Sequence, residues 1–367
     1  MSTLHRVVWL WVLASNVLCS PARAESEPFF GLMRVRDLTP FGFLRLDMRP
    51  AHALNIEVGS WVLETELGCQ NTWALSPEVE KYLTDREPLG RRELDATDLQ
   101  AIRDLPGENY LVDYEAAALD VTLHYKLSEN LSGYLIANAV SYGGGFLDST
   151  IESFHDSFGF STFGRPAASR NDVNLIYDLK SGQAAYFEAP TSGGLSDPTI
   201  GLRYAGLSFT KNWRLALEGA VKIPVAGDRL LLSTGRTDYG VQASLQRFGN
   251  RHAAYLNAAA VYYAGARHPA PQESQLVPTL ILGYEYRWTR RTHLNLQGYI
   301  SDSVYSHKTT DLDELLGLKY QITLGLRHWR DNLLWSFAVT ENLQNINNTP
   351  DIGFQLGLAY IPRLSIR

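Results

Sequence analysis

The sequence has few cysteines and no long apolar run after its first residues. Only two of its 367 residues are cysteines, Cys19 and Cys69. Cys19 falls within an N-terminal export signal described below, so Cys69 alone remains and an intramolecular disulfide is excluded. Beyond that signal no apolar run reaches roughly 18 residues, which excludes a membrane-spanning helix.

Basic residues are also in the minority. The chain has 33 Lys and Arg against 39 Asp and Glu, and without Arg6 and Arg23 of the signal the net charge is about −8. This balance argues against nucleic acid as a partner. The nine histidines show no metal-ligand spacing, and Gly143–Gly145 is not followed by the Lys-Ser or Lys-Thr of a phosphate loop. We therefore expect no cofactor and no metal.

The first 24 residues have the organisation of a cleaved signal peptide. His5 and Arg6 precede an apolar run from Val7 to Ala14, and small residues at 22–24 supply a cleavage site. The mature chain would begin at Glu25. A short membrane anchor is the alternative, but the run is shorter than the roughly 20 residues that a spanning helix needs.

Residues 312–343 show the clearest strand pattern. Apolar side chains occupy alternate positions at Leu316, Leu318, Tyr320, Ile322, Leu324 and Leu326. Polar residues and glycines lie between them, and this period of two predicts a strand with one apolar face. The chain turns near Asp331 and returns with the same alternation, which predicts a long hairpin. Its strands are longer than the usual 5 to 6 residues and match the roughly 9 to 11 of a membrane-crossing strand.

The pattern recurs from Ala53 to the end of the chain. Strands are predicted within 53–62, 119–127, 134–140, 171–189 (two short ones), 200–209, 213–221, 239–245, 256–262, 280–286, 294–300, 316–326, 333–339 and 352–360. These are 14 strands, or 12 if the short pair at 171–189 lies outside the membrane.

The connections between these strands alternate in length. Short turns are predicted near residues 128, 181, 211, 249, 290 and 331, and longer connections near 67, 143, 190, 226, 265, 304 and 344. Short turns on one side and long loops on the other are typical of an outer-membrane β-barrel with periplasmic turns and extracellular loops. A closed barrel leaves no strand edge exposed to lipid. The fold class is therefore an all-β transmembrane antiparallel barrel of about 12–14 strands over residues 53–367, with a soluble β-sandwich as the alternative.

Three segments interrupt the alternation. Residues 25–52 mix aromatic and charged side chains with prolines, and we interpret them as a plug in the lumen or a periplasmic segment. The long loop 67–109 carries two short amphipathic helices, at 77–83 and 98–102. The long loop 143–170 carries a third helical pattern, which we expect to pack into the barrel mouth.

Several motifs resemble a known family. They are residues 36–46 (Arg-Asp-Leu-Thr-Pro-Phe-Gly-Phe-Leu-Arg-Leu), 70–73 (Gln-Asn-Thr-Trp), 144–148 (Gly-Gly-Phe-Leu-Asp), 154–159 (Phe-His-Asp-Ser-Phe-Gly) and 340–343 (Thr-Glu-Asn-Leu). The chain resembles, over most of its mature length, the proteobacterial envelope proteins known as domain of unknown function 3187. The resemblance implies a signal-bearing outer-membrane barrel of a Gram-negative bacterium and brings no established activity. One departure from outer-membrane barrels concerns the terminus, where seven residues follow the aromatic Tyr360.

One pair of residues suggests hydrolytic chemistry. His155 and Ser157 form a His-x-Ser pair of the kind that outer-membrane lipid hydrolases carry on a strand, where the two side chains share a face. Here the pair lies in a helical pattern, in which residues two apart point in different directions. A loop histidine bonded to its neighbours is the ordinary interpretation, so we commit to no catalytic residue.

Three functional classes follow. The first, which we favour, is a barrel that passes or binds a small or amphiphilic solute. The others are a lipid-modifying hydrolase and a structural or adhesive envelope protein. The candidate binding residues in the lumen or loops are Arg34, Arg36, Asp37, Arg45, Glu152, Asp156, Lys319 and Arg327. The expected partners are outer-membrane lipid, the barrel-assembly machinery and a small-molecule solute.

Overall fold

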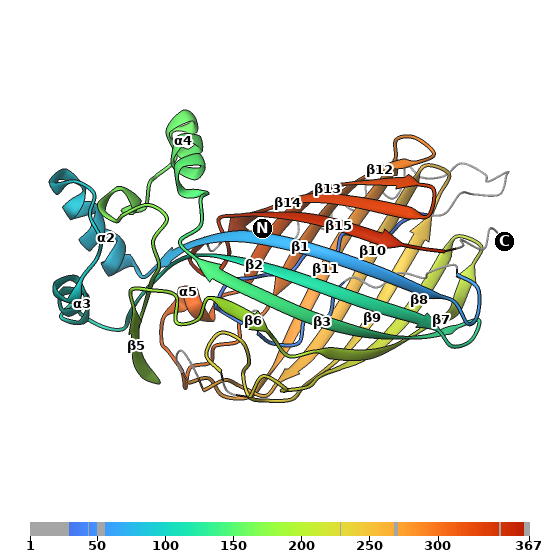
Figure 1. Cartoon of the computed structure of the whole chain (residues 1–367), viewed down its shortest axis with the longest axis horizontal. Coiled ribbons are helices and arrows are strands. Elements are labelled where there is room, and N and C mark those ends of the chain that lie inside the picture. The colour runs from blue at the N-terminus through green and yellow to red at the C-terminus, as the bar shows by residue number, and fades with distance from the viewer. Residues whose placement is uncertain are drawn as a thin grey trace, which may run out of the picture.

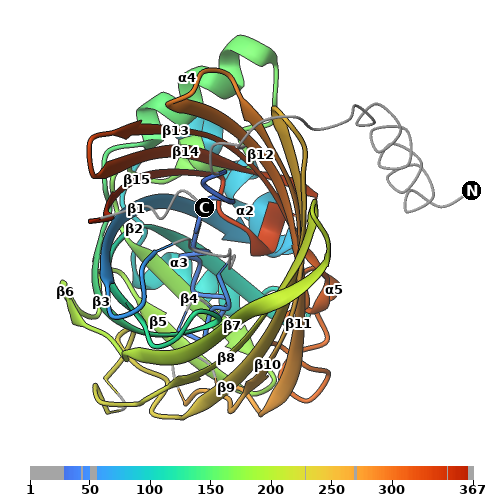
Figure 2. The same cartoon turned by 90° about the vertical axis from the view of Figure 1, so that its right-hand side faces the viewer.

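A computed structural model describes residues 29–42, 44–49, 56–227, 229–267, 271–344 and 346–362. These residues form a closed antiparallel β-barrel of 12 strands (Figures 1 and 2). The predicted signal peptide and the boundary at Glu25 lie outside the described residues. Among the described helices, none is long and apolar enough to cross a membrane.

The barrel strands follow one another in chain order around the ring. They are β1 (Trp61–Leu75), β2 (Asn109–Lys126), β3 (Leu131–Gly143), β7 (Thr199–Thr210), β8 (Trp213–Lys222), β9 (Asp238–Phe248), β10 (His252–Tyr263), β11 (Gln275–Arg287), β12 (Thr292–Ser301), β13 (Lys319–Arg330), β14 (Leu333–Gln344) and β15 (Ile352–Tyr360). The ring closes where β15 pairs with β1, with Leu356 opposite Leu67. Closure gives each of these strands two neighbours, so the ring presents no free edge.

The strands are apolar outside, whereas their inner faces carry polar side chains alongside apolar clusters that contact the inner part of the chain. On β2, Asp120, Thr122 and His124 are buried in the interior, whereas Leu119 and Leu123 are exposed on the outer surface. The period of two in the sequence is therefore the alternation between a polar lumen and an apolar outer wall. This arrangement is the reverse of a soluble barrel, whose interior is apolar.

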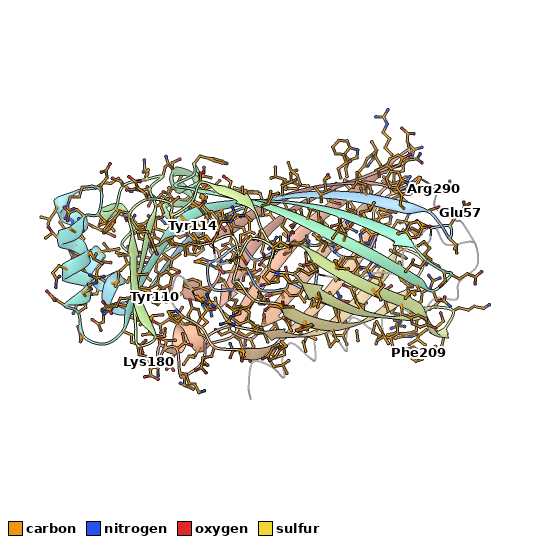
Figure 3. The ribbon with its side chains drawn as sticks, turned by 60° about the horizontal axis from the view of Figure 1, so that its bottom comes forward. Glu57, Tyr110, Tyr114, Lys180, Phe209 and Arg290 are labelled. Atoms are coloured by element: carbon orange, nitrogen blue, oxygen red, sulfur yellow. The ribbon has the colours of Figure 1, made fainter. Side chains whose placement is uncertain are left out.

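The two ends of the barrel differ. The turn end has short connections at 127–130, 211–212, 249–251, 288–291 and 331–332, and the loop end has the long ones. Figure 3 shows Glu57, Phe209 and Arg290 at the turn end and Tyr110 and Lys180 at the loop end. Five of the six predicted short turns are at the turn end. The prediction was wrong for the turn at residue 181, which lies at the loop end.

A cap covers the loop end. It consists of residues 76–108 and 144–192 and contains α2 (Pro77–Arg86), η1 (Glu87–Leu89), α3 (Ala96–Arg103), η2 (Arg165–Ala167), β4 (Asn174–Leu179) and β5 (Gly182–Tyr186). In the view along the barrel, α2, α3, β4 and β5 lie across its opening (Figure 2). The pair β4–β5 continues the sheet from β2 beyond the barrel, so the barrel has 12 strands and not 14.

The cap has its own apolar core. Val79 and Leu83 of α2 and Ile102 of α3 are fully buried against Trp73 and Leu111, which come from the loop ends of β1 and β2. Burial of these side chains stabilises the helices, which are too short to be stable alone. Asp95 begins α3 by accepting hydrogen bonds from the backbone N–H groups of its first turn.

Helix α4 (Asp148–Phe158) differs from the expected position. It projects sideways beyond the ring of strands in both views (Figures 1 and 2), whereas the sequence predicted a helix packed into the mouth. Its first turns are buried at Asp148, Ile151 and Glu152, but Phe154 and Phe158 are exposed. The remaining short elements at the loop end are β6 (Gly193–Leu195), α5 (Asp313–Leu316) and η3 (Ile346–Asn348).

The first strand also differs from its prediction. We expected a strand at 53–62 and a loop from 67 to 109, but β1 runs from Trp61 to Leu75 and β2 begins at Asn109. In the loop halves of both strands, one face packs against the cap and the other points into the filled interior of the barrel. Both faces are therefore buried. Their burial removes the apolar and polar alternation on which the prediction relied. Residues 51–55 lie outside the described part of the chain.

Candidate functional site

Residues 29–42 and 44–49 lie inside the barrel, and aromatic contacts hold the first two of them at the turn end. We refer to the described residues of this stretch, 29–42 and 44–49, as the inner segment. The ring of Phe30 stacks on His293 with centroids 4.2 Å apart and on Trp329 at 6.0 Å. Phe29 stacks on Phe248 at 5.7 Å. These contacts fix the start of the inner segment beside the short turns.

A charged clamp then binds the backbone of Phe30 and Gly31. The carboxylate of Glu285 on β11 accepts hydrogen bonds from both backbone N–H groups, at 2.9 and 3.0 Å. Arg327 on β13 donates to both carbonyl oxygens, at 3.3 Å for Gly31. The carboxylate also accepts from the Tyr255 hydroxyl at 2.5 Å. The peptide group between Phe30 and Gly31 is thus bound at its N–H by Glu285 and at its carbonyl oxygen by Arg327, which have opposite charges.

Arginines of the inner segment form ion pairs with carboxylates on β1 and β2. The pairs are Arg34 with Glu64 at 3.1 Å, Arg36 with Asp120 at 2.9 Å, Arg49 with Glu66 at 2.7 Å and Arg49 with Asp120 at 2.9 Å. Glu64 also lies 2.9 Å from the imidazole of His124. Removing one member of a buried pair leaves a desolvated charge, which costs about 3–5 kcal/mol. The pairs therefore hold the inner segment against one side of the wall.

Two further predicted residues are bound elsewhere in the lumen. The Asp37 carboxylate lies 2.7 Å from Nζ of Lys319 on β13, which also donates to the Thr39 hydroxyl at 3.0 Å. Arg45 donates to the hydroxyl of Tyr299 on β12 at 2.7 Å. The structure therefore brings six of the eight candidate residues to the lumen: Arg34, Arg36, Asp37, Arg45, Lys319 and Arg327.

Inward-facing glycines of the wall make room for the inner segment. A Cβ atom at Gly283 would lie 2.3 Å from Cδ2 of Leu32, and one at Gly325 would lie 2.7 Å from Cγ of Met33. Such distances are closer than real carbon contacts, so only glycine fits at these positions. The wall of β11 and β13 is therefore shaped to the side chains of the inner segment.

The space left between the inner segment and the wall is small. One cavity, lined by Arg34, Glu66 and Asp120, has a volume of about 10 Å³, and a second beside Arg49 and Lys222 has the same volume. A cavity of this size holds about one water molecule. The described inner segment thus packs closely against the wall in both places.

The remaining candidate residues lie in the cap. Glu152 of α4 pairs with Arg91 at 2.7 Å and accepts a hydrogen bond from Nε of Arg170 at 2.8 Å. Burial disfavours its charged form, but these two arginines outweigh burial and lower the pKa of the Glu152 carboxyl. Asp156 is exposed on the same helix. Neither residue faces the lumen.

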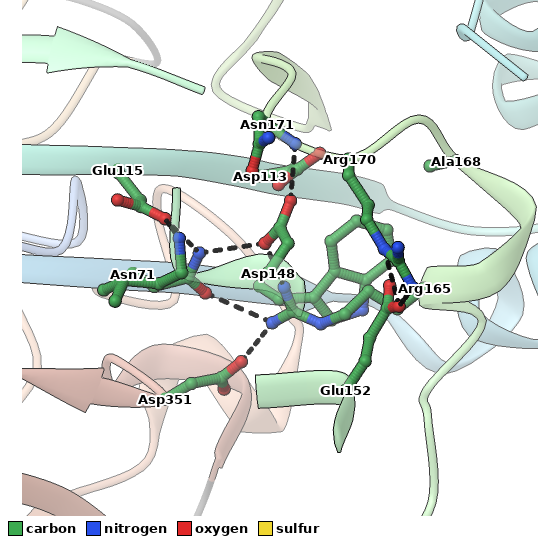
Figure 4. Close-up of polar contacts among 12 residues, drawn as sticks. Asn71, Asp113, Glu115, Asp148, Glu152, Arg165, Ala168, Arg170, Asn171 and Asp351 are labelled. Carbon is green, nitrogen blue, oxygen red and sulfur yellow. Dashed lines mark hydrogen bonds and ion pairs between the residues drawn. The ribbon is translucent and has the colours of Figure 1, made fainter. Parts of the chain in front are cut away.

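A buried polar network joins the base of α4 to the barrel rim (Figure 4). Arg165 pairs with Asp148 at 2.8 Å and with Asp351, which precedes β15. Asn71 of β1 donates to Asp148 at 3.1 Å, and the same carboxylate accepts from the backbone of Asn171 at 2.7 Å. Three separate parts of the chain therefore meet at Arg165 and Asp148.

The His-x-Ser pair is not arranged as a nucleophile and its base. Ser157 donates to the carbonyl oxygen of Ser153 at 2.7 Å, and Nδ1 of His155 lies 2.8 Å from the carbonyl oxygen of Ser161. Both side chains are thus bound to nearby backbone, as two residues on one helix turn would be. Among the described residues, no group of three His, Cys, Asp or Glu side chains is placed to hold a metal ion.

Several residues that bind the inner segment were not singled out from the sequence. They are Glu64, Glu66, Gln70, Asp120, Gln297 and Gln355. All but Gln70, which lies in the loop half of β1, are at positions where the alternation points a polar side chain inward. That alternation could have placed them in the lumen, but it contains no information on which segment they contact.

The fold and this filled polar interior define the class: a 12-strand outer-membrane-type β-barrel. The sequence model of the family described as Protein of unknown function (DUF3187) matches residues 105–361. The chain belongs to this family, and the resemblance noted from its motifs is confirmed. Comparison with curated proteins finds no match.

Two solved structures illustrate the likeness. The COG4313 outer membrane channel from Pseudomonas putida F1 is 13% identical with a TM-score of 0.50, and the match covers 86% of this chain and 98% of that one. The P. putida toluene transporter TodX is 9% identical with a TM-score of 0.39, covering 83% and 91%. At these identities the similarity to the first structure shows the fold alone, and the similarity to the second is too low to show more.

Proposed function

We propose that this protein is an outer-membrane barrel for the passage or binding of a small or amphiphilic solute, and that residues 25–52 are its plug. The turn end would face the periplasm and the cap the cell exterior. The similarity of the fold to that of the solved channel from P. putida supports a role in passage. The apolar outer surface of the barrel supports a place in the outer membrane.

That surface is apolar along many strands. Exposed side chains on the outer wall include Leu67, Leu119, Leu123, Leu135, Leu202, Leu217, Val241, Leu256, Leu296, Leu324, Phe337 and Leu356. An apolar area of this extent on a soluble protein would cause association. In a bilayer it is the surface that contacts lipid.

The observation that carries the proposal is how the inner segment is held. Its described residues form no strand or helix and share no backbone ladder with the wall. They are bound by side chains of the wall, so they can leave without breaking a strand pair. A ring whose wall is independent of its contents is what a plugged passage requires.

Planar-bilayer conductance tests the plug. A variant lacking residues 25–52 but keeping the signal should show conductance well above that of the full chain. Equal conductance of the two would contradict the plug, and absence of conductance from both would contradict passage.

A disulfide gives a sharper control within the full chain. Cγ of Leu32 lies 3.0 Å from the position of a Cβ at Gly283, which is within the reach of a disulfide between cysteines at these positions. We expect Leu32→Cys with Gly283→Cys, in a Cys69→Ser background, to conduct less than the full chain when oxidised and to regain the conductance of the full chain after reduction. Opening by reduction would locate the barrier at the inner segment, and unchanged conductance would place it elsewhere.

The hydrolase alternative is not favoured by the contacts of His155 and Ser157. We expect Ser157→Ala to leave the lipid composition of the envelope unchanged. A changed lipid A or phospholipid profile in that variant would restore the alternative. Trimming residues 76–108 and measuring cell adhesion tests the adhesive alternative in the same way.

A further inference from the structure

The wall of the lumen binds the backbone of the inner segment, and not only its side chains. Side chains of β1, β2, β8, β9, β11, β12, β13 and β15 make 13 hydrogen bonds to its peptide groups. A segment held only by the fit of its side chains would not need these hydrogen bonds. Eight of the 12 barrel strands therefore contact the peptide groups of the inner segment.

Two glutamines of the wall imitate a neighbouring strand. Gln297 accepts from the N–H of Met33 at 3.0 Å and donates to the carbonyl of the same residue at 3.2 Å. Gln70 accepts from the N–H of Leu38 and donates to the carbonyl of Arg36, both at 2.6 Å. An amide side chain has the donor and acceptor of a peptide group, so it can pair with an extended chain as a strand would.

Other wall residues bind single peptide groups. Gln355 donates to the carbonyl of Arg34 at 3.3 Å, Tyr114 to that of Leu38 at 2.7 Å, Lys222 to that of Leu44 at 2.6 Å and Gln242 to that of Arg49 at 3.1 Å, while Asp238 accepts from the N–H of Leu46 at 2.9 Å. Together with the clamp of Glu285 and Arg327, they bind peptide groups from Phe30 to Arg49.

Backbone groups are the same in every peptide, so contacts of this kind do not depend on sequence. We infer that the lumen is a binding site for a peptide, and that the inner segment occupies it as a tethered ligand. This inference rests on the proposed function in one respect, namely that the segment can leave the lumen.

The wall also carries amide groups that the inner segment does not use. Asn257 on β10 and Asn295 on β12 are 1% and 3% exposed, and neither polar atom of either side chain has a hydrogen-bond partner within the described structure. Asn295 lies two residues from Gln297 and opposite Glu285. The binding surface for peptide groups is therefore larger than the part occupied.

The chemistry of the wall narrows the class of ligand. Glu64, Glu66 and Asp120 form an acidic patch that accepts arginines of the inner segment, so basic peptides should bind better than acidic ones. A hydrocarbon would leave these carboxylates and the glutamines buried without partners, at about 1–3 kcal/mol for each polar group. This part of the lumen therefore suits a peptide and not an apolar solute.

Peptide binding can be measured on the full chain. Phe30→Ala, Arg34→Ala and Arg49→Ala together weaken the tethered segment and leave the wall unchanged. Fluorescence anisotropy in detergent would follow three labelled 14-residue peptides. The first has the sequence of residues 29–42, the second an unrelated sequence with the same charge, and the third the first sequence N-methylated at Met33 and Leu38.

We expect the second peptide to bind more weakly than the first, because it lacks the side chains that fit against Gly283 and Gly325. It should still bind measurably, because both peptides have the same backbone. N-methylation removes two donors and should weaken binding at least about tenfold. Gln297→Ala should weaken both unmethylated peptides about tenfold. Gln321→Ala is the matched control, because this glutamine of β13 makes none of the 13 hydrogen bonds to the inner segment and should change neither.

Several results would overturn the inference. They are no binding of any peptide, binding of the first peptide without the second, and equal binding of the methylated peptide. The measurement is separate from conductance. A barrel that binds peptides but never conducts would retain this inference and refute passage, and a conducting barrel without peptide binding would do the reverse.

Discussion

The cap covers one end of the barrel and the inner segment lies inside it, but different forces hold them. The cap is joined to the barrel by a backbone ladder between β2 and β4 and has an apolar core around Leu83 and Ile102. The inner segment has no ladder and is bound by side chains of the wall. Because ladder and core form with the barrel itself, the cap is part of the fold, whereas the inner segment is an occupant of it.

The largest expected effect is that of a substitution at Arg165, which should loosen the cap and leave the inner segment unchanged. Arg165→Ala leaves Asp148 and Asp351 without their buried cation, at a cost of about 3–5 kcal/mol to the docking of the α4 loop. Limited proteolysis should cut residues 148–170 faster, while hydrogen exchange of Leu32 and Met33 stays unchanged. Arg170→Ala is the control, since this half-exposed arginine should contribute only about 0–1 kcal/mol. Loosening of the inner segment by Arg165→Ala would show that the cap and the inner segment are coupled.

The next effect concerns the inner segment alone. Gly283→Leu places atoms where Leu32 packs, and overpacking of this kind costs about 1–3 kcal/mol. Hydrogen exchange at Leu32 and Met33 should accelerate without faster proteolysis of the cap. Gly298→Leu on β12 is the matched control, because nothing lies within 4 Å of its added Cβ. Equal protection in the two variants would mean that the recess at Gly283 does not hold the segment.

A smaller effect is expected at a single hydrogen bond. Tyr114→Phe keeps the ring but removes the donor to the carbonyl of Leu38, which should weaken the hold on the inner segment by about 0.5–1.5 kcal/mol. The rate of disulfide formation between cysteines at positions 32 and 283 reports this change. Tyr82→Phe in the cap is the comparison, and it should leave that rate as it is.

The smallest effect is the pH dependence of the cap. The pKa of Glu152 is lower in the folded protein than in the unfolded chain, so its contribution is fully present above the unfolded pKa. The contribution is lost as the pH falls through the folded pKa. Proteolysis of the α4 loop should thus differ between the wild type and Glu152→Gln at neutral pH and converge in acid. A difference that persists in acid would mean that the carboxylate charge is not responsible.

The sequence predicted most of the fold, because alternation and strand length depend on local chemistry. It identified the apolar outer wall, five turns of the turn end and the helices of the cap. It missed the loop halves of β1 and β2, where contact with the cap buries both faces and removes the alternation. It also placed α4 in the mouth, because a helical pattern does not indicate which neighbour the helix will contact.

The site was predicted to a lesser degree. Alternation placed Lys319 and Arg327 in the lumen, and composition singled out Arg34, Arg36, Asp37 and Arg45 as polar residues of a separate segment. The pairing between the two sets could not be read from the sequence. Asp37 and Lys319 are 282 residues apart, and their contact depends on the closure of the whole ring.

Strands β1 and β2 run without interruption from the turn end to the cap and have 15 and 18 residues. A mechanical load on the cap would be carried along two hydrogen-bonded strands and shared by many parallel bonds. A load on the start of the inner segment would act in turn on the rings of Phe29 and Phe30, the clamp and the ion pairs. Pulled from the turn end, the segment should come out at a force that leaves the rest of the molecule intact.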